Sequence, residues 1–166
     1  MDNKRMIPDI GEVNVVESFL SGKMKVFVNG KELAKVSKNE FAYINENNET
    51  INFILTGNVF KGINLEINKM DYQMSPKSSP LEIFLAILPF IFDIIWGNIP
   101  STVSIFPIVG GAIGGVITAL LGMTGLIFMK KTKNVLFKIL IGLGFAIVAI
   151  LICYLIALAI LSSAQQ

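Results

Sequence analysis

One acidic residue, Asp93, lies deep in a long apolar run and is the first candidate in this chain for a chemical role. A carboxyl group is costly to bury in a membrane-spanning segment, and such groups commonly carry protons or ions or bind a charged partner. Alternatively, Asp93 lies at the membrane–water interface, within a turn of Trp96 and Gly97, where water solvates it. The apolar segments contain no lysine, arginine or histidine that could pair with it, which favours the interfacial interpretation.

Other residue types that perform chemistry are scarce. The sequence contains no histidine, which removes the commonest general base and the commonest metal ligand. Its one cysteine, Cys153, lies inside an apolar run, which excludes a disulfide framework and a cysteine-based zinc site. Phosphate-binding loops, nucleophile elbows, metalloprotease motifs and EF-hand loops are also absent from the sequence. We therefore expect a protein that is not an enzyme, with no catalytic residue, cofactor or metal site.

The C-terminal half has the composition of a membrane domain. The chain of 166 residues is 53% hydrophobic with a mean hydropathy of +0.66, and residues 81–162 account for the excess. Uncharged apolar runs extend from Ile105 to Met129 and from Ile139 to Leu161, longer than the ~20 residues that cross a bilayer as a helix. A third run, from Leu81 to Trp96, is shorter and contains Pro89. Three spans, at about 81–99, 105–129 and 137–161, are favoured over two.

A lysine cluster between the last two apolar runs predicts the orientation. Excess basic charge in a short loop marks the cytoplasmic side of the membrane. With three spans the N-terminal domain is then cytoplasmic, whereas with two spans it lies outside. Binding of anionic lipid is the less favoured alternative for these residues, because a role in setting the topology explains them fully. The cluster consists of Lys130, Lys131, Lys133 and Lys138.

Small residues recur at helical spacing in both long apolar runs. Because lipid provides no hydrophobic drive for helix association, close approach of backbones at small residues supplies the contacts. We expect these stripes to hold the two long helices together as a hairpin, with self-association of copies as the alternative. Permeation along the glycines is less favoured, because polar lining groups are few. The stripe residues are Gly110, Gly111, Gly114, Gly115, Ala119 and Gly122 in one run, with Gly142 and Ala146 in the other.

The N-terminal half predicts a small antiparallel β-sandwich or open barrel over residues 1–70, followed by a linker at 71–80. Asn29-Gly30, between the runs 24–28 and 31–36, is a strong hairpin signal because both residues tolerate positive φ. Further strands are expected at 41–44, 50–56 and 63–67, while 12–20 fits either a strand or a short helix. The fold class is therefore mixed, a β domain followed by a helical membrane domain.

The run Val26-Phe27-Val28-Asn29-Gly30-Lys31-Glu32-Leu33, followed by a second hairpin, resembles the small PEGA-type β-sandwich modules. The similarity covers roughly residues 24–68. The Pro-Glu-Gly-Ala turn that gives these modules their name is absent, and Glu46-Asn47-Asn48-Glu49 stands in its place. The resemblance implies an adhesive or spacer domain without catalytic residues.

These features predict a multi-pass cell-membrane protein in which the β domain is an adaptor or accessory subunit anchored by a glycine-rich helical bundle. The alternative is a homo-oligomeric pore or small transport protein assembled through the glycine stripes. Expected partners are the lipid bilayer and either further copies of the chain or a larger membrane protein. Nucleic acid is not expected, because residues 1–80 carry ten basic and ten acidic side chains and form no basic stripe.

Overall fold

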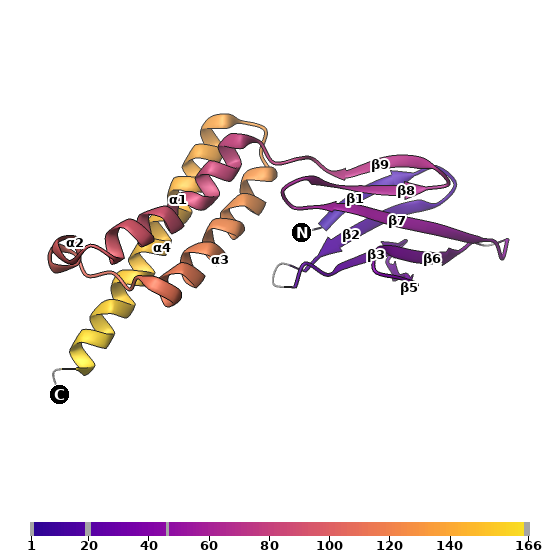
Figure 1. Ribbon diagram of the computed structural model, residues 1–166. Coiled ribbons are helices and arrows are strands. Elements are labelled where there is room, and N and C mark those ends of the chain that lie inside the picture. The colour runs from indigo at the N-terminus through magenta and orange to yellow at the C-terminus, as the bar shows by residue number, and fades with distance from the viewer. Residues whose placement is uncertain (1, 19–20, 46, 165–166) are drawn as a thin grey trace. The chain divides into compact units, whose positions relative to one another are not determined.

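The computed structural model describes residues 2–18, 21–45 and 47–164. The chain divides into two compact units, Met1–Ser78 and Ser79–Gln166, which we call the β module and the helical bundle. Within the described residues, the β module contains two open antiparallel sheets and the helical bundle contains four helices (Figure 1). The mixed fold class predicted from the sequence is confirmed, with open sheets rather than a closed barrel.

The first sheet has four strands in the order β1-β2-β3-β4. Asn29 and Gly30 connect β3 and β4 with φ values of 49° and 80°, as the predicted hairpin turn requires. The Asn29 side chain also accepts a hydrogen bond from the Glu12 amide at 2.9 Å, which holds the start of β2 against this turn. The strands are β1 (Asp2–Ile7), β2 (Gly11–Glu17), β3 (Met24–Val28) and β4 (Lys31–Glu32).

The second sheet has five strands in the order β5-β6-β7-β8-β9, each antiparallel to its neighbour. The strands predicted at 41–44, 50–56 and 63–67 are present, and the middle one continues through Gly57, which has a φ of 93°. The strands are β5 (Ala34–Lys35), β6 (Glu40–Ile44), β7 (Thr50–Asn58), β8 (Gly62–Ile67) and β9 (Met70–Ser75).

The prediction of one continuous strand at residues 31–36 is wrong. Residues 31–32 pair in the first sheet and residues 34–35 in the second, with Leu33 between them. Leu33 is buried in the core, so the chain crosses between the sheets at this residue. The core is otherwise made of alternate side chains from both sheets: Ile7, Val13, Val15, Val26, Val28, Phe41, Phe53, Leu55, Ile63, Leu65, Ile67 and Met74.

The predicted linker at 71–80 is also wrong over its first half, because residues 71–75 belong to β9. Asn68 and Lys69 form the turn before it, both with positive φ. The connection to the bundle is shorter still. Ser78 donates from its amide and hydroxyl groups to the carbonyl oxygens of Phe60 and Val59, whereas Ser79 already caps the first helix.

Three helices of the bundle are long and apolar enough to cross a membrane, as predicted: α1 (Pro80–Gly97), α3 (Gly111–Lys130) and α4 (Val135–Ser163). At about 1.5 Å per residue, α1 with 18 residues is about 27 Å long and α4 with 29 residues about 43 Å. Each of the three contacts the other two, and α4 continues beyond the ends of α1 and α3 (Figure 1).

The second span starts six residues later than predicted, at Gly111 instead of Ile105. A short helix, α2 (Pro100–Ile105), precedes it, and residues 106–110 are not helical. Pro107 disfavours helical backbone at Phe106, which is extended with φ −142° and ψ 97°. Gly111 then has a φ of 69° at the first position of α3. Proline and glycine in the backbone therefore delay the helix, although the composition is apolar throughout.

Candidate functional site

The carboxyl group of Asp93 lies where the three long helices meet. Its side chain is 1% exposed, and neither oxygen has a hydrogen-bond partner among the described residues. Gly114 of α3 lies directly against this group, since a Cβ atom built on it would lie 2.6 Å from Oδ2 of Asp93. The fully buried thiol of Cys153 on α4, a weak donor, lies near the same carboxyl group. We call Asp93, Gly114 and Cys153 the carboxyl junction.

Thr118 is buried one turn after Gly114 in α3, and its hydroxyl group forms hydrogen bonds within its own helix. It donates to the carbonyl oxygen of Gly114 at 2.9 Å and of Gly115 at 3.2 Å. Such bonds back to the preceding turn satisfy a buried hydroxyl without a partner on another helix. Asp93 therefore remains the unsatisfied polar group of the junction.

The end of the bundle next to Asp93 is closed by an aromatic cluster. Phe92 stacks on Trp96 at 5.3 Å between ring centroids, and Phe106 stacks on Tyr154 at 4.3 Å. The Trp96 indole N–H donates to the Phe106 carbonyl oxygen at 2.8 Å, which joins α1 to the 106–110 segment. The Val109 amide donates in turn to the Cys153 carbonyl oxygen at 3.3 Å. The 106–110 segment is thus held against both α1 and α4.

This closure corrects the interfacial interpretation of Asp93. The sequence favoured a side chain solvated by water within a turn of Trp96, yet the side chain is enclosed by protein. The reason is the fold of the α2 region, whose return segment approaches α1 so closely that a Cβ atom on Gly97 would lie 2.6 Å from Cα of Gly110. The position of Asp93 near the end of α1 therefore does not expose its side chain to water.

The charge of the Asp93 carboxylate must be balanced within the junction. An ionised carboxylate enclosed without a counter-charge is costly by several kcal/mol, so a proton or a cation must balance it. Among the described residues there is no group of three or more metal-ligating side chains, and no second acid joins Asp93 in the junction. The arrangement is suited to holding a single proton or cation at the Asp93 carboxyl group.

The main glycine stripe of α3 faces α1, not α4. Gly114 lies against Asp93, and a Cβ atom on Gly122 would collide with the carbonyl oxygen of Ala86 in α1. The predicted hairpin of the two long helices therefore assigned this stripe to the wrong partner. Contact between α3 and α4 instead involves Gly125, where a Cβ atom would lie 3.2 Å from the Phe145 side chain.

The remaining stripe residues fall into two groups. Gly111 and Ala119 are exposed on the outer face of α3, and Gly115 is half-buried beside Phe90 of α1. The stripe of α4 is buried along its whole length and faces the bundle, where Leu85 of α1 lies against Gly142. Its buried members are Gly142, Ala146, Ala149, Cys153 and Ala157.

A buried ion pair, not foreseen from the sequence, joins the starts of α1 and α4. Lys138 Nζ lies 2.6 Å from Glu82 Oε1, and their side chains are 19% and 4% exposed. The other Glu82 oxygen accepts from the Ser79 amide at 2.7 Å, while the Ser79 hydroxyl accepts from the Glu82 amide at 3.3 Å. This is a capping box, and the spacing Ser79-x-x-Glu82 was the signal for it.

The other lysines of the cluster lie at the same end of the bundle. Lys131 places its ammonium group 5.1 Å from the centroid of the Phe128 ring, while Lys133 is exposed and Lys130 is half-buried at the end of α3. These residues therefore surround the α3–α4 connection, and Lys138 has in addition the ion pair with Glu82.

Comparisons with family models, with curated proteins and with solved structures find no match to this chain.

We predict that Gly122→Ala and Gly114→Ala each destabilise the bundle by about 1–3 kcal/mol, because the added methyl group meets backbone or the Asp93 carboxyl group. Gly144→Ala is the matched control, since a Cβ atom at Gly144 meets nothing within 4 Å. Unfolding in mixed detergent micelles measures the difference. Equal stability of all three variants would contradict the close α1–α3 packing.

We also predict that Asp93→Asn leaves the stability of the bundle unchanged within about 1 kcal/mol, because an amide has nearly the same shape and no charge to neutralise. Asp93→Lys should prevent folding, since it places a longer side chain and an unpaired charge against Gly114. The same unfolding assay reports both. A large loss in Asp93→Asn would mean that the ionised form is required, and hence that a cation occupies the junction.

Proposed function

We propose that this chain is a non-enzymatic integral membrane protein whose β module acts as an adaptor on the cytoplasmic face, anchored by the helical bundle. The three long apolar helices make it a candidate membrane-embedded protein by length and composition. Our proposal concerns the partner that the β module binds and the side of the membrane on which the module lies.

The observation that carries this proposal is the Glu82–Lys138 ion pair. It places the first turn of α1 beside the first turn of α4, at the end of the bundle where the lysine cluster lies. Because α1 begins at Pro80, the chain enters the bundle from the β module at this same end. The positive-inside rule assigns a lysine-rich end to the cytoplasm. Together these points favour a cytoplasmic β module.

A binding role is supported by the surface of the β module. Among the depressions on the described part of the module, two differ clearly in composition, and their volumes are about 190 Å³ and about 610 Å³. The smaller is lined by three lysines, and the larger by asparagines together with Asp9 and Glu49. Concave sites with a few polar groups are the usual places for recognition.

The pore alternative has less support from the contacts of the bundle. A pore assembled through the glycine stripes would place Asp93 or the stripe residues at an axis shared between copies. Within one chain, Gly114 and Gly122 are already occupied by α1, and Asp93 is enclosed. Of the α3 stripe residues, Gly111 and Ala119 remain exposed on the outer face of the helix.

Sidedness is the first test. In a Cys153→Ala background, single cysteines at Asn47 and Ser163 are treated in intact cells with a membrane-impermeant maleimide. We expect labelling at Ser163 and protection at Asn47 until the cells are lysed, because three spans separate the two ends. A cysteine at Ser101, in the exposed α2 region, serves as a second outer control. Labelling of Asn47 in intact cells would reject a cytoplasmic module.

Photo-crosslinking distinguishes an adaptor from a pore. A photoreactive amino acid is placed at the exposed positions Ile44 and Met70 of the β module, and at Val116 and Leu155 on the outer faces of α3 and α4. An adaptor predicts discrete products of other proteins from the β-module sites. A pore predicts crosslinks between copies from the helix sites, together with liposome conductance that Asp93→Asn changes. Products from the helix sites alone would therefore contradict the adaptor proposal.

A further inference from the structure

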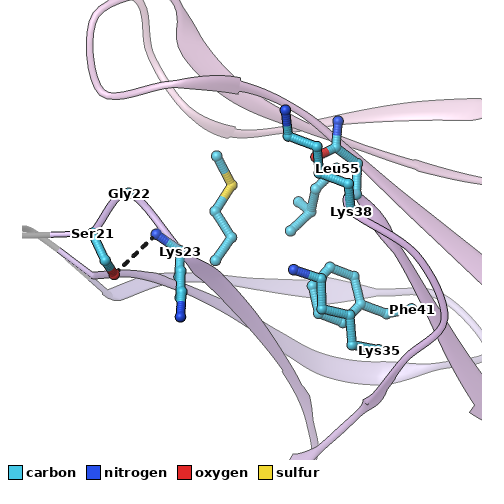
Figure 2. A pocket seen from close by; sticks show the side chains of 9 residues that line it. Ser21, Gly22, Lys23, Lys35, Lys38, Phe41 and Leu55 are labelled. Carbon is cyan, nitrogen blue, oxygen red and sulfur yellow. Dashed lines mark hydrogen bonds between the residues drawn. The ribbon is translucent and has the colours of Figure 1, made fainter.

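The smaller of these two depressions is lined by basic side chains and has an apolar floor (Figure 2). Its floor includes Phe41 and Leu55, which are 3% and 2% exposed. Lys23 lies on one side of it and Lys35 and Lys38 on the other (Figure 2). We call this depression the lysine pocket; its other lining residues are Ser21, Gly22, Met24 and Asn39.

The segments that carry these lysines are fixed by backbone hydrogen bonds. The Lys23 carbonyl oxygen accepts from the Ser18 amide at 2.8 Å immediately before β3. On the opposite side, the Asn39 carbonyl oxygen accepts from the Leu55 amide at 2.8 Å, and Lys35 pairs with Phe41 in the second sheet. The pocket is therefore formed by both sheets of the folded module, from residues far apart in the sequence.

The three lysines of the pocket form no ion pair with the described residues of the module. No carboxylate of the described residues forms an ion pair with Lys23, Lys35 or Lys38, and no described lining residue is acidic. Elsewhere on the module lysines do find such partners, as in Lys4–Glu12 at 3.1 Å and Lys25–Glu32 at 3.0 Å. The ammonium group of Lys35 instead lies 5.9 Å from the centroid of the Phe41 ring, over the floor.

This concentration of charge stands out because residues 1–80 are neutral overall, with ten basic and ten acidic side chains. The larger depression shows the opposite bias, since Asp9 and Glu49 line it and no described lining residue is basic. Charge is thus segregated between the two depressions. Like charges gathered without counter-charges repel one another, so an anion that binds among the lysines relieves that repulsion.

We propose that the lysine pocket is a binding site for a phosphate group carried by a small molecule or a lipid headgroup. Lysine ammonium groups are strong phosphate ligands as point charges, and the side-chain amide of Asn39 adds an uncharged donor. At about 190 Å³ the pocket is smaller than the about 300–1,000 Å³ of sites for drug-sized ligands, which favours a phosphate group over a whole nucleotide. The apolar floor accommodates the carbon atoms next to the phosphate.

In the proposed function, the bilayer around the bundle is one source of such groups. Ser78 is hydrogen-bonded to the β module and Ser79 caps α1, so the chain reaches the membrane anchor without a free residue between them. A lipid phosphate is then present at high local concentration. The lipid source rests on the proposed function, because it requires the module to be tethered at a membrane surface. Binding of a phosphate group in the pocket does not depend on the face of the membrane at which the module lies.

Lysine acetylation of the full-length protein in nanodiscs tests the proposal. The reactivity of each lysine is measured by mass spectrometry in discs of phosphatidylcholine while inorganic phosphate is added, with chloride at equal ionic strength as the control for screening. We expect phosphate to protect Lys23, Lys35 and Lys38, while the exposed lysines outside the pocket, Lys31, Lys61 and Lys69, keep their reactivity.

A charge-matched pair of variants tests the residues. Lys35→Gln should raise the phosphate concentration that half-protects Lys23 and Lys38 by about tenfold, because one charge-assisted contact is lost. Lys31→Gln, which makes the same change of charge outside the pocket, should leave that concentration unchanged. An equal effect of the two variants, or equal protection of every lysine, would overturn the proposal.

Discs of differing lipid distinguish the sources of the phosphate. Protection in discs that contain phosphatidic acid, and not in discs with the same fraction of phosphatidylglycerol, identifies a lipid phosphomonoester as ligand. Protection by inorganic phosphate alone supports the pocket and identifies a soluble phosphate compound. Equal protection by both anionic lipids without any effect of inorganic phosphate reflects surface charge and overturns the site, as does no protection at all. Failure of the sidedness test would not change these outcomes.

Discussion

The helical bundle depends on how closely α1 can approach the backbone of α3. In lipid the helices gain no hydrophobic free energy by associating, so the contacts must come from close packing. Gly114 and Gly122 provide the space for them, one against the side chain of Asp93 and the other against the main chain of Ala86. The path of α1 along this stripe brings Asp93 into the junction and brings Glu82 within reach of Lys138. A larger residue at either glycine would displace both features together.

The β module shows which parts of a fold local sequence determines. The turn at Asn29-Gly30 was predictable because positive φ at both positions follows from residue type. The turn at Asn68-Lys69 has the same backbone, but lysine gives no such signal, and β9 was therefore mistaken for linker. The division of residues 31–36 between two sheets was equally hidden, because the crossing at Leu33 depends on the shared core rather than on alternation.

The candidate sites were harder to predict than the elements. The length of the apolar runs was enough to predict three helices that could cross a membrane. Which helix packs against the glycine stripe depends on tertiary packing, which the spacing of the glycines does not determine. Asp93 is buried because residues 106–110 return against α1 and α4, which follows from Pro107 and the glycines that delay α3. The lysine pocket joins Lys23 to Lys35 and Lys38 across two sheets, and along the sequence these residues look like ordinary surface charge.

The unequal lengths of the helices have a consequence for the membrane itself. A hydrocarbon core of ~30 Å is slightly thicker than the length of α1 and much thinner than that of α4. Lipid beside α1 must thin to cover the bundle, whereas α4 must tilt or extend its last turns into the headgroup region. One face of the bundle is thus matched to a thinner bilayer than the other. Membranes of different thickness would therefore strain the two faces of such a bundle unequally.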